Sequence, residues 1–282
     1  MIKNLVCQLI LATSLLLLSL NVLAEENSLP LVPLPSVIDY TKGDGWAGAI
    51  GLKLESLAVY SGSDHYVLEL KPEGAIQWRK GNHLIFWEGL DLNSTEFGWR
   101  GLILDIWLMQ AGIRHETVLP ASRTEKANID NFPHRGSHII GFIEAKRSID
   151  DDWENWASGR ISAGPSNFGL LAEISAGHNF IRRLDNMEAE LVIFSTFGSK
   201  DNINNYFGIS ESDSNASGLE QVNLDGGYRS TGLKLICRKH ILTNIQIVAK
   251  AGVEFYNNNF RKSYIVRDTS ETSSELAVVW KF

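Results

Sequence analysis

The sequence predicts an all-β protein, an antiparallel transmembrane β-barrel of about 12 strands. Three observations predict it: an apolar N-terminal segment typical of export, segments in which apolar and polar residues alternate, and an aromatic residue at the C-terminus. A tilted membrane strand needs roughly 9 to 11 residues, with one face toward lipid and the other toward the barrel interior. The alternating segments have about that length.

Composition excludes several classes of protein. Lys and Arg number 26 against 33 Asp and Glu, a net charge of −7 over 282 residues. Neutralising phosphates requires a basic surface, so this balance argues against a nucleic-acid-binding protein. The hydrophobic fraction of 44% excludes a disordered polymer or a collagen.

Residues 1–24 have the pattern of a secretory signal peptide. Lys3 supplies the charged start, Leu5 to Leu20 are mostly apolar, and cleavage is expected after Ala24. A membrane-anchoring helix is the alternative, but the small residue that ends the segment and the two glutamates behind it favour cleavage. Cys7 lies inside the apolar segment, so a lipoprotein anchor would have no acceptor cysteine.

Cleavage would leave Cys237 as the single cysteine, so no intramolecular disulfide is expected. Residues 25–44 contain three of the seven prolines, which indicates an extended periplasmic segment ahead of the barrel. The barrel is expected over residues 45–282.

No helix that could span a membrane is expected in the mature chain. The most apolar stretches, Leu102 to Met109 and His138 to Ile143, are far shorter than the roughly 20 residues that such a helix needs. The clearest alternation is at 245–256, where Ile245, Ile247 and Ala249 are separated by polar or smaller residues. Strands are expected near 46–58, 74–79, 83–91, 97–104, 108–116, 137–147, 154–163, 168–178, 187–196, 226–238, 244–256 and 273–282.

Alternation alone does not separate a membrane barrel from a secreted β-sandwich. Loop lengths favour the barrel, because the long connections 117–136, 197–225 and 257–272 all follow odd-numbered strands. Outer-membrane barrels have short periplasmic turns and longer external loops. The count depends on a turn near Asp105, and Pro72 is expected to shorten the second strand.

The C-terminal strand and the tryptophans fit the same prediction. Four residues on one face, Leu276, Val278, Trp280 and Phe282, form a terminal aromatic strand of the kind that the outer-membrane assembly machinery recognises. Tryptophans fall near strand ends, where they could form interfacial girdles. They are Trp46, Trp78, Trp87, Trp99, Trp107 and Trp280.

Several motifs resemble the MipA/OmpV family of Gram-negative outer-membrane proteins. The first strand and loop carry Gly45-Trp46-Ala47-Gly48 and then Tyr60-Ser61-Gly62-Ser63-Asp64. A later loop carries Tyr206-Phe207-Gly208-Ile209-Ser210 and then Ser217-Gly218-Leu219, and the closing segment carries Ser263-Tyr264-Ile265-Val266. Tyr264 stands where the family usually has a proline.

The resemblance implies a non-enzymatic scaffold that brings a murein hydrolase and a murein synthase together at the periplasmic face. It also leaves open a porin-like channel for small solutes. For a scaffold, the surface open to periplasmic partners would lie on the turns 148–153, 179–186 and 239–243, which carry Asp150, Asp151, Asp152, Arg182, Arg183, Arg238 and Lys239. For a channel, Glu188, Glu190, Lys250 and Glu254 would face the lumen and set selectivity.

A lipid-modifying enzyme is a third hypothesis, because seven histidines and many serines allow a nucleophile with a base in reach. The chain has no G-x-S-x-G motif, and His115-Glu116 lacks the second histidine of H-E-x-x-H. No catalytic residue, cofactor or metal site is therefore expected. The expected location is the outer membrane, among lipid and lipopolysaccharide.

Overall fold

The computed structural model describes residues 44–90, 95–119, 135–150, 153–165, 168–184 and 187–282. The expected signal peptide, its cleavage near Ala24 and the proline-containing segment lie outside these residues, as do Asp151 and Asp152. No described helix is long and apolar enough to cross a membrane.

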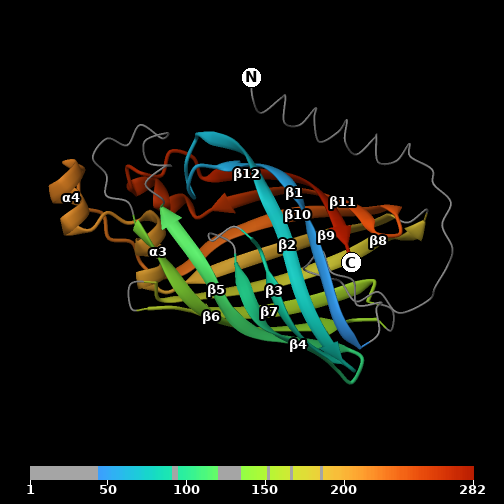
Figure 1. Cartoon of the computed structure of the whole chain (residues 1–282). Coiled ribbons are helices and arrows are strands. Elements are labelled where there is room, and N and C mark those ends of the chain that lie inside the picture. The colour runs from blue at the N-terminus through green and yellow to red at the C-terminus, as the bar shows by residue number, and fades with distance from the viewer. Residues whose placement is uncertain (1–43, 91–94, 120–134, 151–152, 166–167, 185–186) are drawn as a thin grey trace.

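Twelve described strands form one closed antiparallel barrel (Figure 1), which confirms the predicted fold. Each strand pairs with its neighbours in the chain, and β1 pairs with β12. The strands are β1 (Gly45–Ala58), β2 (Tyr66–Lys80), β3 (His83–Glu88), β4 (Glu96–Ile103), β5 (Trp107–Leu119), β6 (Arg135–Ser148), β7 (Asn155–Ala163), β8 (Leu170–Leu184), β9 (Met187–Gly198), β10 (Gly227–Leu242), β11 (Ile245–Tyr256) and β12 (Ser270–Lys281).

The turn expected near Asp105 is present between β4 and β5. Residues 104–106 separate the paired residues Ile103 and Trp107, and Leu104 and Asp105 have φ angles of 53° and 57°, which let the chain reverse its direction tightly. Because this turn separates β4 from β5, the number of described strands is even. The connections 120–134, 199–226 and 257–269 therefore all leave the same end of the barrel, which we call the outer end.

The expectation that Pro72 shortens the second strand is wrong. β2 runs through Pro72, which pairs with Leu52 of β1. On its other side β2 pairs with β3 only from Ala75 to Lys80. Pro72 therefore lies on a part of β2 that has one neighbour among the described strands, where a missing N–H group is tolerated.

The outer surface of the barrel is apolar. Along β9, Leu191, Ile193 and Phe197 are exposed while Val192 and Phe194 between them are buried, as expected for a strand between lipid and interior. Near the inner end, where the short turns lie, Trp46 is 72% exposed and pairs directly with Trp78. These outward rings occupy the position of an interfacial girdle.

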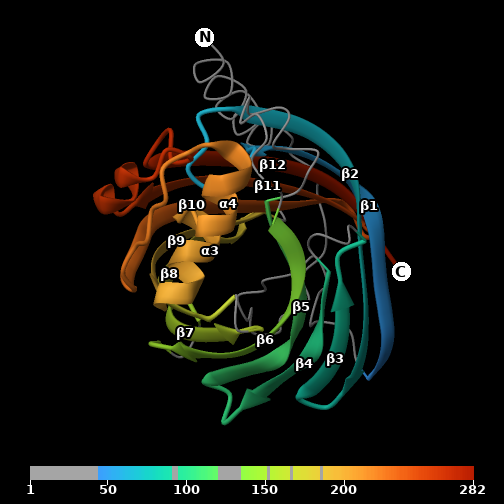
Figure 2. The ribbon, with the colours of Figure 1, turned by 90° about the vertical axis from the view of Figure 1, so that its left-hand side faces the viewer.

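Short helices gather at the outer end (Figure 2). The β9–β10 connection contains α3 (Lys200–Phe207) and α4 (Glu211–Ser217), and the β11–β12 connection contains the 3-10 helix η2 (Asn258–Lys262). Figure 2, which views the barrel from this end, shows α3 and α4 in front of the β7–β9 side of the ring. The two connections pack against one another in a shared hydrophobic core.

Candidate functional site

A hydrophobic core, which we call the cap, spans the outer mouth of the barrel. Its buried residues come from the connections β1–β2, β7–β8, β9–β10 and β11–β12 and from the outer ends of β5, β6 and β11. They are Val59, Tyr60, Val118, Ile140, Phe168, Ile203, Tyr206, Phe207, Ile209, Leu224, Tyr256, Phe260, Ile265 and Val266. Loops from several sides of the barrel therefore share one core.

The β1–β2 loop is fastened to the β11–β12 loop. The hydroxyl of Tyr60 donates to the carbonyl of Ile265 at 2.9 Å. The carbonyl of Gly62 accepts from the backbone N–H groups of Arg267 and Asp268 at 2.7 and 3.0 Å. Gly62 has a φ of +90°, and a Cβ there would lie 3.3 Å from Val266. The positive φ favours glycine at this position, and the close Val266 side chain leaves little room for a larger residue.

The β9–β10 loop reaches across the mouth to β5. The Tyr206 hydroxyl donates to the carboxylate of Glu116, which also accepts from Arg114 at 2.6 Å. The guanidinium of Arg229, on β10, lies over the Tyr206 ring at 4.2 Å. Phe207 stacks on Phe260 with ring centroids 4.5 Å apart. An ionic and aromatic network thus ties the β9–β10 and β11–β12 connections to the strands β5 and β10.

Local sequence rules explain the shape of the β9–β10 loop. Ser199 caps α3 by accepting from the Asn202 N–H group, and Ser210 and Asp213 form a reciprocal capping box at the start of α4. Gly218 ends α4 in the left-handed region with a φ of 73°. The side chain of Asn204 bonds to both backbone groups of Leu224, at 2.6 and 2.7 Å.

Burial perturbs the two cap tyrosines that lie outside the strands, Tyr60 and Tyr206. Desolvation raises the pKa of Tyr60 to about 12. Desolvation, followed by the charge of Glu116, raises the pKa of Tyr206 well above its usual range. Both hydroxyls therefore stay protonated and keep donating hydrogen bonds at neutral pH.

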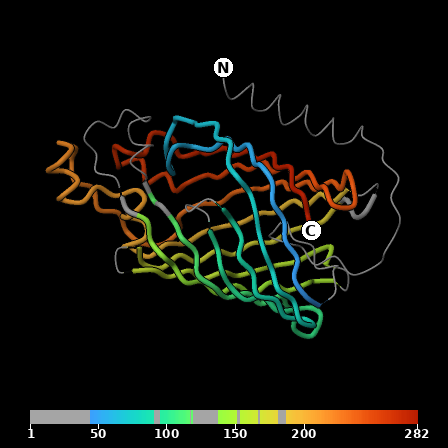
Figure 3. Tube along the Cα trace, viewed as in Figure 1, coloured from blue at the N-terminus to red at the C-terminus, as the bar shows by residue number. Residues whose placement is uncertain are grey.

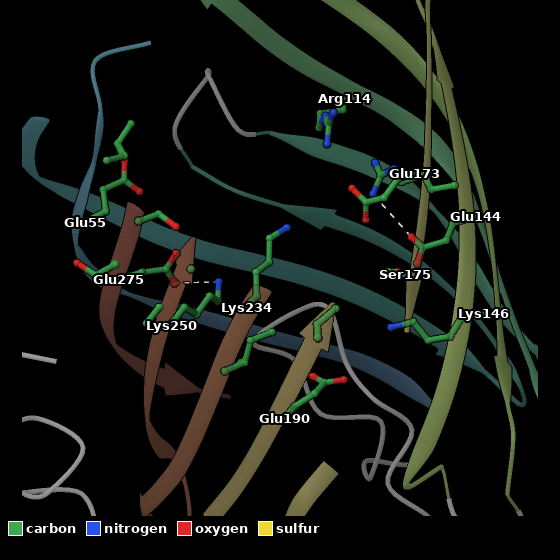
Figure 4. Close-up of a pocket in the computed structure, with 18 of the residues that line it drawn as sticks. Glu55, Arg114, Glu144, Lys146, Glu173, Ser175, Glu190, Lys234, Lys250 and Glu275 are labelled. Atoms are coloured by element: carbon green, nitrogen blue, oxygen red, sulfur yellow. Dashed lines mark ion pairs between the residues drawn. The ribbon is translucent and has the colours of Figure 1, made fainter. Parts of the chain in front are cut away.

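Beneath the cap lies a polar cavity of about 450 Å³, which we call the chamber (Figure 4). Its lining includes five acidic and five basic side chains: Glu55, Glu144, Glu173, Glu190, Glu275, Arg114, Lys146, Arg160, Lys234 and Lys250. They come from opposite walls of the barrel. The alternation that faces apolar residues outward places these charges inward.

One wall of the chamber, on β1, β2, β11 and β12, carries lysine–glutamate pairs. Glu55 contacts Lys53 at 3.2 Å and Lys71 at 2.5 Å. Lys250 contacts Glu275 at 2.9 Å, a pair that Figure 4 marks with a dashed line. The pairs Glu55–Lys71 and Lys250–Glu275 bridge neighbouring strands and so reinforce closure of the barrel.

On the facing wall of the chamber, an arginine and a tryptophan of β7 contact the glutamates. Arg160 contacts Glu96 at 3.1 Å and Glu144 at 3.7 Å. The indole N–H of Trp156 donates to Glu190 at 2.7 Å, and the guanidinium of Arg160 lies 3.9 Å from the centre of the Phe142 ring. The interior side chains are therefore largely held in place.

The structure brings together the two motif loops expected from sequence. Tyr60, Tyr206 and Phe207 are members of the cap, and Gly62 contacts it. Ser63 is buried and accepts a bond from the His65 N–H group. The remaining motif residues shape the β9–β10 loop: Gly208 ends α3, and Ser217 and Gly218 end α4.

The C-terminal aromatic face points outward as expected. Val278, Trp280 and Phe282 are exposed, and the rings of the latter two lie 5.1 Å apart. Leu276 lies on the same face and is half-buried. The residues expected in the lumen do face inward: Glu190 and Lys250 line the chamber, Glu188 contacts Arg238, and Glu254 lies opposite Gly232 in the register.

The expected periplasmic turn at 239–243 is wrong. β10 continues to Leu242, so Arg238 and Lys239 are strand residues and both are buried. Arg238 faces the interior, 3.8 Å from Glu188 and 3.9 Å from Glu190. A charged run suggested a turn, but the barrel interior also takes charges.

Three other described members of the expected partner surface lie at the inner end, namely Asp150, Arg182 and Arg183. Arg182 and Arg183 lie near the end of β8, which runs to Leu184. The Asp150 carboxylate accepts from the backbone N–H groups of Glu154 and Asn155, each at 2.8 Å. Asp150 therefore shapes its turn, in addition to any role as a surface charge.

Sequence reasoning missed several cap and chamber residues. Glu116 was considered only as part of a failed metal motif, and Arg229, Lys146 and Lys234 were not singled out. Inward parity within β5, β6 and β10 was the available signal for Glu116, Lys146 and Lys234, whereas Arg229 lies at a register shift between Tyr228 and Ser230. Among the described residues, no group of three His, Cys, Asp or Glu side chains could hold a metal ion, and Cys237 is free.

Comparison with known proteins gives one family and several distant barrels. The family model described as MltA-interacting protein MipA matches residues 50–282, more than half of the chain. No curated protein matches the sequence.

Several solved structures are similar in fold. The NanC porin structure has a TM-score of 0.46 at 12% identity, and the alignment covers 82% of this chain and 100% of the NanC chain. A KdgM porin has a TM-score of 0.43 at 11% identity, covering 83% and 99%. The Ralstonia pickettii toluene transporter TbuX has a TM-score of 0.40 at 8% identity, covering 85% and 90%.

Proposed function

The chain belongs to the MipA family of outer-membrane β-barrels, and from this premise we propose that it is a non-enzymatic interaction protein of the murein machinery. In this role it binds a murein hydrolase and a murein synthase at the periplasmic face. The family description, an MltA-interacting protein, is the observation that carries the proposal. Export of the chain by a signal peptide cleaved near Ala24 belongs to the same proposal.

The architecture supports binding at the inner end. The cap joins loops of the outer end into one hydrophobic core, so the short turns of the inner end are the simpler surface for a periplasmic partner. The inner end carries short turns, among them Gly81–Asn82 and Thr243–Asn244. Short turns on a rigid barrel present a fixed surface, which lowers the entropy that a partner must lose on binding.

The test is co-purification of murein hydrolase and synthase with the detergent-solubilised protein. The variant reverses charge at the inner end with Asp151→Lys, Asp152→Lys, Arg182→Glu and Arg183→Glu, leaving Asp150 in place because it holds the turn. Capture should fall by about tenfold or more, since rim and turn charges steer and orient partners.

The matched control reverses Arg261 and Lys262, which are exposed on the β11–β12 connection at the outer end. This control should capture both enzymes as the wild-type protein does. Equal capture by the inner-end variant, or no capture by the wild type, contradicts the proposal.

The chamber favours one second candidate, a porin-like channel for small solutes. Its volume of about 450 Å³ and its charged lining would suit a hydrated solute. Purified protein in a planar bilayer would then conduct ions without further change. A bilayer that stays silent, while a known porin conducts in the same setting, removes this candidate.

A further inference from the structure

Three of the ten charged side chains that line the chamber lack an opposite charge within 4 Å. Seven have one: Glu55, Glu144, Glu190, Glu275, Arg114, Arg160 and Lys250. The three without such a partner among the described residues are Lys146, Lys234 and Glu173. Two unpaired ammonium groups therefore share a cavity with one unpaired carboxylate.

Each unpaired lysine lies over an aromatic ring. The Lys146 ammonium is 3.8 Å from the centre of the Trp156 ring, and the Lys234 ammonium is 4.3 Å from that of Phe194. A ring face attracts a cation but accepts no strong hydrogen bond, so the N–H donors of the buried Lys146 ammonium still need acceptors. Lys234 is exposed, so its ammonium is open to a ligand that enters the chamber. Neither ammonium donates a hydrogen bond to any described side chain or carbonyl.

The acids around Lys146 do not cancel its charge. Glu144 and Glu190 interact with it electrostatically, and so do the cations Arg100 and Arg238. Glu144 lies 3.7 Å from Arg160, and Glu190 lies 3.9 Å from Arg238. Since each glutamate already has an arginine, the buried ammonium remains a net positive centre, which is costly unless a counter-ion binds.

We propose that the chamber binds a small organic carboxylate through Lys146 and Lys234, a property separate from partner binding at the inner end. Figure 4 shows both ammonium groups directed into the cavity, from facing parts of the barrel wall. The carboxylate oxygens of the ligand would accept hydrogen bonds from both ammonium groups. The rings of Trp156 and Phe194 would contact the carbon atoms of the ligand. The cavity of about 450 Å³ is large enough for such a molecule.

Glu173 gives the proposal its sharpest test, because it lines the same cavity and repels an anion. The probe is glutarate, added to the full mature protein in a neutral detergent and followed by saturation-transfer NMR. Saturable binding is expected for the wild type. Lys234→Met and Lys146→Met should each weaken it by about tenfold or more, and Glu173→Gln should tighten it by about threefold.

The matched control is Lys262→Met, which removes an exposed lysine outside the chamber and should bind glutarate as the wild type does. Retention of the heat-dependent gel shift shows that each variant is folded. Absence of saturable transfer up to about 50 mM glutarate, unchanged affinity in Lys234→Met, or equal displacement by sulfate each overturns the carboxylate assignment.

Discussion

The ring of Phe282, the last residue of the chain, lies over Gly48 of the first strand. A methyl group at position 48 would come within 2.5 Å of Phe282 Cε2. The two residues also exchange backbone hydrogen bonds, each of 2.9 Å. The seam that closes the barrel therefore continues to the terminal residue, and a motif glycine makes room for the terminal aromatic ring.

The first prediction compares two glycines at this seam. At Gly51 a Cβ would overlap the backbone carbonyl of Val278, which cannot move without opening the seam, whereas at Gly48 it meets only a terminal ring that can rotate. We expect Gly51→Ala to cost about 1–3 kcal/mol of stability and Gly48→Ala to cost less. Thermal loss of the fast-migrating folded band on gels measures both. A melting temperature for Gly51→Ala at or above that of Gly48→Ala contradicts this assignment.

The second prediction concerns alkaline pH. In the unfolded chain Tyr60 ionises near pH 10, but in the folded protein its pKa is raised to about 12. Between these values the unfolded state binds fewer protons, so the free energy of unfolding falls as pH rises, by at most about 1.4 kcal/mol per pH unit. Melting temperatures of wild type and Tyr60→Phe at pH 8 to 12 should show a shallower decline for the variant. Tyr264→Phe, at an exposed tyrosine of the β11–β12 connection, is the control that should follow the wild type.

The third prediction follows from the position of Arg238 inside the barrel. Arg238→Glu would place a third carboxylate beside Glu188 and Glu190. We expect a loss of about 3–5 kcal/mol, seen as a lower melting temperature and less protein assembled in the outer membrane. Arg238→Met removes the charge but keeps the length of the side chain, and should be milder. Wild-type stability of Arg238→Glu would show that the side chain does not lie in the interior.

Much of the fold could be predicted because lipid imposes a strict period on the strands. Alternation and turn positions were sufficient to place the turn near Asp105 and to obtain an even number of strands. The same rule failed at Arg238 and Lys239, because charge marks both an exposed turn and the inward face of a strand. Sequence alone does not separate these environments, since both are polar.

The cap and the chamber could be predicted only in part. The motif residues Tyr60 and Tyr206 were singled out by resemblance, but their shared core depends on loops that meet only after the barrel closes. Glu116 becomes a cap residue because Tyr206 reaches it across the mouth. Such a contact has no signature in local periodicity. Lys146 and Lys234 could not be distinguished in the sequence from the other charged residues that face the barrel interior.

The last prediction tests whether the cap closes the lumen. Gly198 pairs with Gly227 at the outer ends of β9 and β10, so residues 200–225 can be replaced by a short Gly-Ser link that joins the strands as a hairpin. The replacement removes Tyr206, Phe207 and α4 from the cap while leaving every described barrel strand intact. We expect the wild type to be silent in planar bilayers and the shortened protein to conduct, because a barrel of about 12 strands is wide enough for water once its plug is removed. The control is Tyr206→Phe, which loses the hydroxyl bond to Glu116 but keeps the ring under Arg229, and should stay nearly silent. Equal conductance before and after the replacement would show that the β9–β10 loop is not what closes the barrel, and would favour the channel over the interaction protein.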